Sequence, residues 1–148
     1  MNKFGIGQPI KRKEDSRLLT GNGVYVDDIS FPHQVYADFL RSPHAHAEII
    51  EVNTKEAQVA PGIVAVYTKT DLESSGLGPL PVSFMPENAP PGFAPEFPIL
   101  GAKIVRYVGQ SVAMVIAQTP EQATHALELI KVTYRPLETS IEIEKAVS

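Results

Sequence analysis

The chain has 148 residues, of which 43% are hydrophobic and 20% charged, and its formal net charge is −4 at pH 7. This length suits one globular domain with a core of its own. A mildly acidic chain without a basic stripe is unsuited to nucleic-acid backbones, so we expect no nucleic acid among its partners. The chain contains no cysteine, which excludes disulfides, thiolate metal sites and iron–sulfur ligation within it.

The N-terminal stretch, Met1–Gly7, lacks the long apolar segment of a signal peptide. No run of about 18 apolar residues occurs, so we expect no membrane-spanning helix and no membrane partner. Together with the absence of cysteine, these features favour a cytoplasmic location.

Residues 1–34 are predicted to form an extended N-terminal arm. The basic stretch 11–13 precedes a helical turn expected to start near Glu14 or Asp15 and to end at Gly21, because glycine readily adopts the left-handed conformation of a helix end. The arm has little apolar surface of its own, so it needs a larger body to lie against. Its candidate domain-interface residues are Arg12, Glu14, Asp15 and Arg17.

Residues 35–148 are predicted to form a single domain with the arm. Strands are expected at Val35–Arg41, Glu48–Asn53 and Ile63–Lys69. The first main helix is expected at about residues 54–60, with Asn53 and Glu56 at capping-box spacing. Since a parallel crossover needs about a dozen residues or more, this short helix favours an α+β domain with a mixed or antiparallel sheet.

A Pro-rich loop is predicted at residues 73–99, after a turn that begins at Asp71. Seven of the 13 prolines lie in it: Pro79, Pro81, Pro86, Pro90, Pro91, Pro95 and Pro98. Proline lacks an N–H and restricts the residue before it, so neither a helix nor a central strand can run through this segment. A long irregular loop is uncommon in a compact domain unless it is functional or a partner orders it.

The second main helix is predicted at about residues 120–131. Thr119 is the expected N-cap, Pro120 suits the first helical position, and Gln122 stands at the capping-box position. One apolar face repeats at helical spacing through Ala123, Ala126, Leu127 and Ile130. Further strands are expected at Lys103–Tyr107, Ser111–Gln118 and Val132–Arg135.

His44 and His46 are the best candidates for metal ligands. Residues two apart in a strand face the same side, so both imidazoles could reach one ion. No third ligand is evident, and we favour a polar corner at residues 41–46 whose side chains bind the backbone. Glu14 and Asp15 are adjacent, so they do not face each other on a helix and are expected in ion pairs and a helix cap.

No catalytic, cofactor-binding or metal-binding residue is predicted in this chain. The glycine pairs around residues 5–7 and 21–23 lack the spacing of a phosphate-binding loop. Arg106 could bind a carboxylate, a phosphate or a neighbouring domain. The remaining candidate domain-interface residues are therefore Arg41, His44, His46 and Arg106.

Five segments in chain order resemble the large subunits of the aldehyde oxidase, xanthine dehydrogenase and carbon monoxide dehydrogenase family. They are Gly7–Gly21 with Gly23–Asp28; Arg41–Ala47 with Ile49; Pro61–Val66 with Thr68, Asp71 and Leu72; Val105–Gly109 with Val112, Ala113 and Ala117; and Val132 with Tyr134, Pro136 and Leu137. Together they cover nearly the whole chain.

The resemblance implies an α/β hammerhead domain that precedes the large molybdenum-binding region. The family binds molybdopterin, often as the cytosine dinucleotide, and oxidises aldehydes, purines, other heterocycles or carbon monoxide. Its electrons leave through iron–sulfur and flavin partners. Its catalytic glutamate and most cofactor contacts lie in the region that follows this domain, so the resemblance implies that this chain alone binds no cofactor and does not catalyse.

The leading hypothesis is a structural domain, or a split subunit, that packs against the molybdenum-binding region. The sequence leaves open which of the two it is. One alternative is a small metal-dependent enzyme that uses His44 and His46. Another is a binding module whose Pro-rich loop docks a partner.

Overall fold

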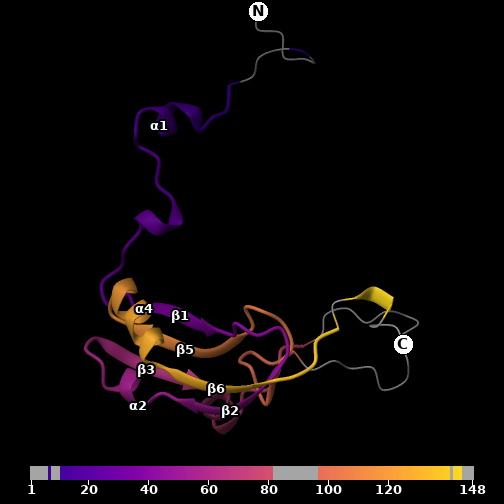
Figure 1. Cartoon of the computed structure of the whole chain (residues 1–148). Helices are drawn as coiled ribbons and strands as arrows, with labels where there is room; N and C mark the ends of the chain where they lie inside the picture. The colour runs from indigo at the N-terminus through magenta and orange to yellow at the C-terminus, as the bar shows by residue number, and fades with distance from the viewer. Residues whose placement is uncertain (1–6, 8–10, 82–96, 141, 145–148) are drawn as a thin grey trace, which may run out of the picture. The chain divides into compact units, whose positions relative to one another are not determined.

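The computed structural model describes residues 7, 11–81, 97–140 and 142–144 (Figure 1). The chain divides into two units, residues 1–34 and 35–148, which are described separately. The helices are α1 (Asp15–Leu19), the 3-10 helix η1 (Val26–Asp28), α2 (Lys55–Gln58), α3 (Lys69–Ser74) and α4 (Pro120–Leu129). The strands are β1 (Tyr36–Arg41), β2 (Ala47–Asn53), β3 (Ile63–Thr68), β4 (Ile104–Val105), β5 (Ser111–Ala117) and β6 (Lys131–Pro136).

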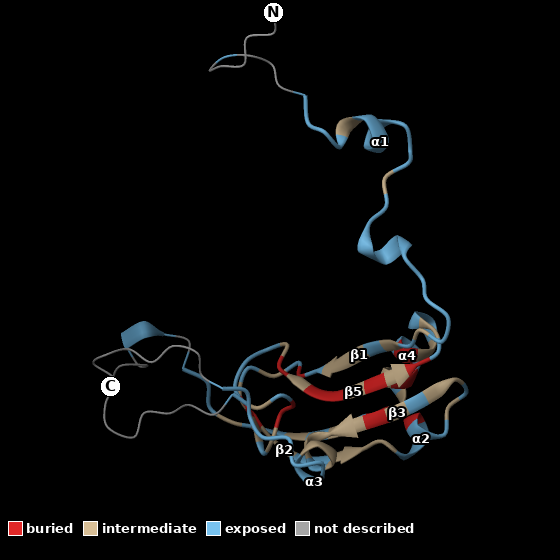
Figure 2. Ribbon diagram, turned by 180° about the vertical axis from the view of Figure 1, so that it is seen from behind, coloured by how far each residue is buried: buried red, intermediate tan, exposed pale blue. Residues whose placement is uncertain are grey.

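The first unit has two short helical segments and no buried residue among those described (Figure 2). Helix α1 starts at Asp15, and Gly21 takes the expected left-handed conformation with φ of 74°. A carboxylate oxygen of Asp28 accepts a hydrogen bond from the Tyr25 backbone N–H at 2.8 Å. Local hydrogen bonds therefore shape the described part of this unit, which has no buried residues to form a core.

The second unit contains two three-stranded sheets, with strand orders β1-β5-β3 and β4-β2-β6. Each strand pair in the described residues is antiparallel. This arrangement confirms the predicted α+β class. The consecutive strands β1 and β2 lie in different sheets, so the chain changes sheet through residues 42–46.

The main core lies between the first sheet and the helices α2 and α4. Three alternate residues of β5, Ala113, Val115 and Ala117, are fully buried there. They pack with Ala57 of α2 and with Ala123 and Ala126 of α4. The prediction of α4 is confirmed, because Thr119 Oγ1 accepts a hydrogen bond from the Gln122 N–H at 3.3 Å. A smaller cluster of Ala47, Val105 and Val112 joins the two sheets.

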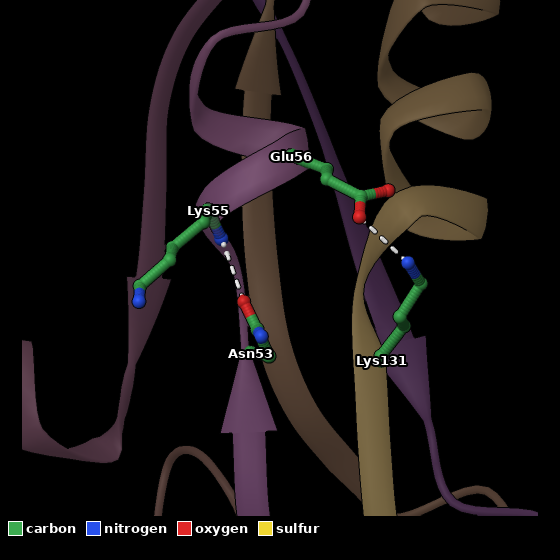
Figure 3. Close-up of polar contacts among 4 residues, drawn as sticks. All are labelled: Asn53, Lys55, Glu56 and Lys131. Atoms are coloured by element: carbon green, nitrogen blue, oxygen red, sulfur yellow. Dashed lines mark hydrogen bonds and ion pairs between the residues drawn. The ribbon is translucent and has the colours of Figure 1, made fainter.

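The capping box predicted at Asn53 and Glu56 is wrong. The Asn53 side chain accepts a hydrogen bond from the Lys55 N–H at 3.2 Å, and the Glu56 carboxylate instead pairs with Lys131 Nζ at 2.6 Å (Figure 3). The Glu56 carboxylate therefore binds Lys131 of β6, which is distant in sequence, and does not cap helix α2. Helix α2 spans only part of the expected range.

A helix replaces the turn predicted at Asp71. Both the backbone N–H and the hydroxyl of Thr68 donate to a carboxylate oxygen of Asp71, at 2.7 and 2.6 Å. These bonds cap α3, so the first residues of the predicted 73–99 loop are helical. An isolated antiparallel bridge joins Leu80 to Phe97. The intervening part of that loop, residues 82–96, lies outside the described residues.

Candidate functional site

The corner at residues 41–46 is built around two buried polar side chains. Ser42 is 2% exposed and Gln110 is 5% exposed. The Ser42 hydroxyl lies 3.0 Å from both the N–H and the carbonyl oxygen of His44. The Ser42 N–H donates to the Gln110 carbonyl, and the Ser42 carbonyl accepts a hydrogen bond from the Gly109 N–H. Gln110 Oε1 accepts a hydrogen bond from the Arg106 N–H. The corner thus joins the end of β1 to the turn before β5.

The two histidines of this corner have different partners. The His44 ring contacts Tyr134 edge to face, with ring centres 4.9 Å apart. His46 Nδ1 lies 2.6 Å from the carbonyl oxygen of Glu138. Burial raises the pKa of Tyr134, and a hydrogen bond with the Ser42 side chain opposes part of that rise. Among the described residues, no group of three or more His, Asp or Glu side chains is arranged to hold a metal ion.

The two arginines expected at an interface lie near this corner but differ in their contacts. Arg41 Nη1 donates to the Gly109 carbonyl at 3.0 Å, and the guanidinium carbon lies 6.0 Å from the centre of the Phe39 ring. The Arg106 side chain is exposed and makes no ion pair within the described part of the chain. Arg41 is therefore used by the fold, whereas Arg106 remains available.

The four charged candidates of the arm form no cluster. Arg12, Glu14 and Arg17 are exposed and Asp15 is partly buried. None makes a side-chain hydrogen bond or ion pair with another described residue. Glu14 precedes α1 without capping it through its side chain. The ion pairs and side-chain cap expected around Glu14 and Asp15 are thus not found.

Sequence reasoning missed two members of the corner, Gln110 and Tyr134. The only local signal for Gln110 is a polar residue between a turn glycine and the apolar run of β5. The contact between Tyr134 and His44 depends on the pairing of strands that are distant in sequence, which residue spacing does not reveal.

A groove of about 150 Å³ lies beside α3, where Leu72, Leu77 and Leu100 line it. This volume is below the usual range of about 300–1,000 Å³ for small-molecule sites.

No helix in the described part of the chain combines the length and apolar character needed to cross a membrane.

Known proteins match this chain over almost its whole length. Over 143 residues it is 38% identical to the carbon monoxide dehydrogenase large chain of Afipia carboxidovorans, covering 97% of this chain and 17% of that protein. Over 142 residues it is 36% identical to the nicotine 6-hydroxylase large subunit of Paenarthrobacter nicotinovorans, covering 96% of this chain and 17% of the relative. The chain thus spans about one-sixth of the length of these curated relatives.

Solved structures and a family model agree with these relatives. The quinoline 2-oxidoreductase of Pseudomonas putida 86 superposes with a TM-score of 0.84 at 35% identity, over 99% of this chain and 18% of that one. The family model described as "Aldehyde oxidase and xanthine dehydrogenase, a/b hammerhead domain" matches residues 20–138. The chain therefore belongs to the aldehyde oxidase and xanthine dehydrogenase family, of which it comprises the α/β hammerhead domain.

Proposed function

We propose that this chain is a non-catalytic structural domain, or a split subunit, of a molybdenum hydroxylase. It packs against the molybdenum-binding region of the large subunit and stabilises that region with its cofactor. The parent enzyme oxidises aldehydes, purines, other N-heterocycles or carbon monoxide. The observation that carries the proposal is the arm, which is specific in sequence yet lacks any core among its described residues.

The arm exposes large apolar side chains that a free surface does not need. Leu19 is 86% exposed, Val26 84% and Phe31 70%. Arg12 and Arg17 add cationic groups without intramolecular partners in the described residues. Large apolar side chains that are left in water gain free energy when they are buried against another surface. The arm therefore has the chemistry of a segment that lies along another polypeptide surface.

The choice of substrate lies outside this chain. Relatives named for nicotine, carbon monoxide and xanthine match 96–97% of it with similar identities of 36–38%. The same domain therefore occurs in relatives whose names give different substrates. This supports a role common to all of them, such as supporting the cofactor-bearing region.

The donor groups of this chain do not fit an iron–sulfur cluster, one of the redox groups of the parent enzyme. That enzyme uses molybdopterin, in the cytosine dinucleotide form, with iron–sulfur and flavin groups in partner subunits or domains. The chain has no cysteine to bind an iron–sulfur cluster. Its described residues offer no cluster of metal ligands. We therefore assign no redox step to its residues. Separately, we infer a cytoplasmic location from the lack of cysteine.

Omission of the chain tests the proposal. The remaining large subunit is prepared with its iron–sulfur and flavin partners, with and without this chain, and molybdenum content and substrate oxidation are measured. We expect both to fall without the chain and to recover when the 148-residue chain is added back. Full activity with normal cofactor retention in its absence would contradict the proposal.

A second preparation isolates the role of the arm. Deletion of residues 1–34 is expected to weaken association with the large subunit, while the double variant Arg12→Ala with Arg17→Ala weakens it less. A matched control replaces Lys55, an exposed cation of α2, by alanine and leaves association unchanged. Normal association of the truncated chain would show that the arm does not carry the contact.

A further inference from the structure

Strand β5 has an unusual composition for a sheet with one face in water. Its residues Val112–Ala117 are six consecutive apolar residues, and it lies in the middle of the β1-β5-β3 sheet. In an antiparallel sheet with one solvated face, apolar and polar residues alternate, whereas a continuous apolar run is typical of a strand covered on both faces. The sequence of β5 is therefore typical of a strand that is covered on both faces.

Helices cover only one of these faces in the described residues. Ala113, Val115 and Ala117 point toward α2 and α4 and are fully buried. Since successive strand residues point to opposite faces, Met114 and Ile116 lie on the other side. Neither belongs to the two buried clusters or packs against them. Figure 2 shows the three strands side by side with no helix drawn across their middle.

Strand register extends this second face into a continuous apolar patch. Met114 pairs with Phe39 on β1 and with Tyr67 on β3. Ile116 pairs with Ala37 on β1 and with Ala65 on β3. We name these six residues the open face: Ala37, Phe39, Ala65, Tyr67, Met114 and Ile116. Each of them is partly buried except Ala37, which is exposed.

Of the two charged residues of β1, only Arg41 lies beside the open face. Asp38 directs its carboxylate to the helical side, where Thr124 Oγ1 donates to it at 3.4 Å. Arg41 lies at the margin, with its guanidinium carbon 6.0 Å from the centre of the Phe39 ring. A partner that placed an isolated charge against the two apolar rows would leave that charge buried and unpaired, at a high cost. The open face therefore fits an uncharged, apolar surface.

We propose that the open face docks against an apolar surface of the polypeptide region that follows this domain in large subunits of the family. This inference rests on the proposed function. The size of the relatives supports this occupant, because the chain matches only 17% of each of the two relatives described above. Most of such a subunit lies outside the matched domain, and we take this remaining polypeptide as the occupant.

Oxidation of Met114 tests the contact directly. The probe is the molybdenum-binding region encoded in the same organism, mixed with the full 148-residue chain. Peroxide is applied to the free chain and to the complex, and sulfoxide at Met114 is followed by mass spectrometry. We expect rapid oxidation in the free chain and about tenfold or greater protection in the complex, because interface residues exclude water. Equal oxidation of both, or protection already present in the free chain, overturns the proposal.

Binding of variants provides a second readout. Phe39→Lys is expected to weaken the Kd for that region about thirtyfold or more, as for a central interface residue. Phe39→Ala is a milder variant, used with circular dichroism to separate lost binding from lost folding. The control is Val59→Lys, which changes an apolar residue that is 83% exposed at the end of α2 and leaves binding unchanged.

The outcomes separate the two proposals. If the unmodified chain does not bind the molybdenum-binding region, the proposed function fails and the open face loses its partner. If it binds and both Phe39 variants bind equally well, only the docking face is wrong. A free chain that sediments as a dimer, and becomes monomeric with Phe39→Lys, identifies a second copy as the occupant and also overturns the proposal.

Discussion

Gly62 shows how one residue depends on a contact between distant parts of the chain. It adopts φ of 78°, which L-residues with a side chain rarely take. A methyl group on it would overlap the carboxamide of Gln122 on α4. Its carbonyl also accepts a hydrogen bond from the Gln118 N–H at 2.9 Å. Glycine at this position therefore serves both the turn into β3 and the approach of α4.

Replacement of this glycine should be more damaging than its conformation alone explains. Gly62→Ala is expected to lower the free energy of unfolding by about 2 kcal/mol, which combines left-handed strain with displacement of the Gln122 carboxamide. Gly76→Ala is the control, because Gly76 has φ of 75° but open space around its Cα. It should lower that free energy by about 1 kcal/mol. Urea unfolding measures both, and equal losses would contradict a clash with Gln122.

Two capping-box spacings in this chain also differ in outcome for a physical reason. Thr68 and Asp71 form their reciprocal contact within one turn, so local sequence was sufficient to predict it, although we expected only a turn there. Asn53 and Glu56 have the same spacing, but Lys131 binds the Glu56 carboxylate. A local pattern cannot reveal a competitor that lies 75 residues away.

At the scale of elements, helix α4 was easier to predict than the arrangement of the sheets. Helix α4 was predictable because its N-cap, its first-position proline and its apolar face all lie within its own sequence. The division into two sheets was not, because β1 pairs with β5 across a long stretch of chain. The polar corner was foreseen as a backbone-binding turn, whereas the burial of Gln110 depends on that pairing.

The N-terminus of α3 has a testable dependence on pH. Hydrogen bonds from the side chain and backbone of Thr68 lower the pKa of Asp71 below its ordinary value of 3.8. A carboxyl group with a lowered pKa in the folded state stabilises the fold above its ordinary pKa and loses that contribution as the pH falls through its folded pKa. The contribution is therefore complete at pH 7 and declines below 3.8.

Asp71→Asn should consequently lower the free energy of unfolding at pH 7 by about 1 kcal/mol, the usual value of a helix cap. The difference from the unmodified chain should shrink as the pH is lowered below the ordinary pKa of 3.8. Urea unfolding at several pH values measures it. Glu128→Gln is the control, since Glu128 is exposed on α4 and has no polar side-chain partner in the described residues. A difference that stays constant with pH would exclude the carboxylate charge as its source.

At the scale of the whole molecule, sequence predicted the arm and the domain but not what each one contacts. The arm is recognisable because charged residues and glycines interrupt its sequence and leave no long helix or strand pattern. The open face is not, because the side of β5 that the helices cover depends on the register of β1 and β3. The two features differ in exposure, because large apolar side chains of the arm are exposed, whereas those of the open face are partly buried and lie outside both buried clusters.

The arm should therefore matter for assembly and not for folding. Since none of its described residues is buried, deletion of residues 1–34 is expected to change the free energy of unfolding by less than about 0.5 kcal/mol. The denaturant slope should change little as well, because it follows the surface exposed on unfolding. Thr119→Ala, which removes the α4 cap, should lower that free energy by about 1 kcal/mol and verifies the sensitivity of the measurement. A loss above about 1 kcal/mol on truncation would show that the arm stabilises the isolated domain, and the arm would then no longer support an external partner.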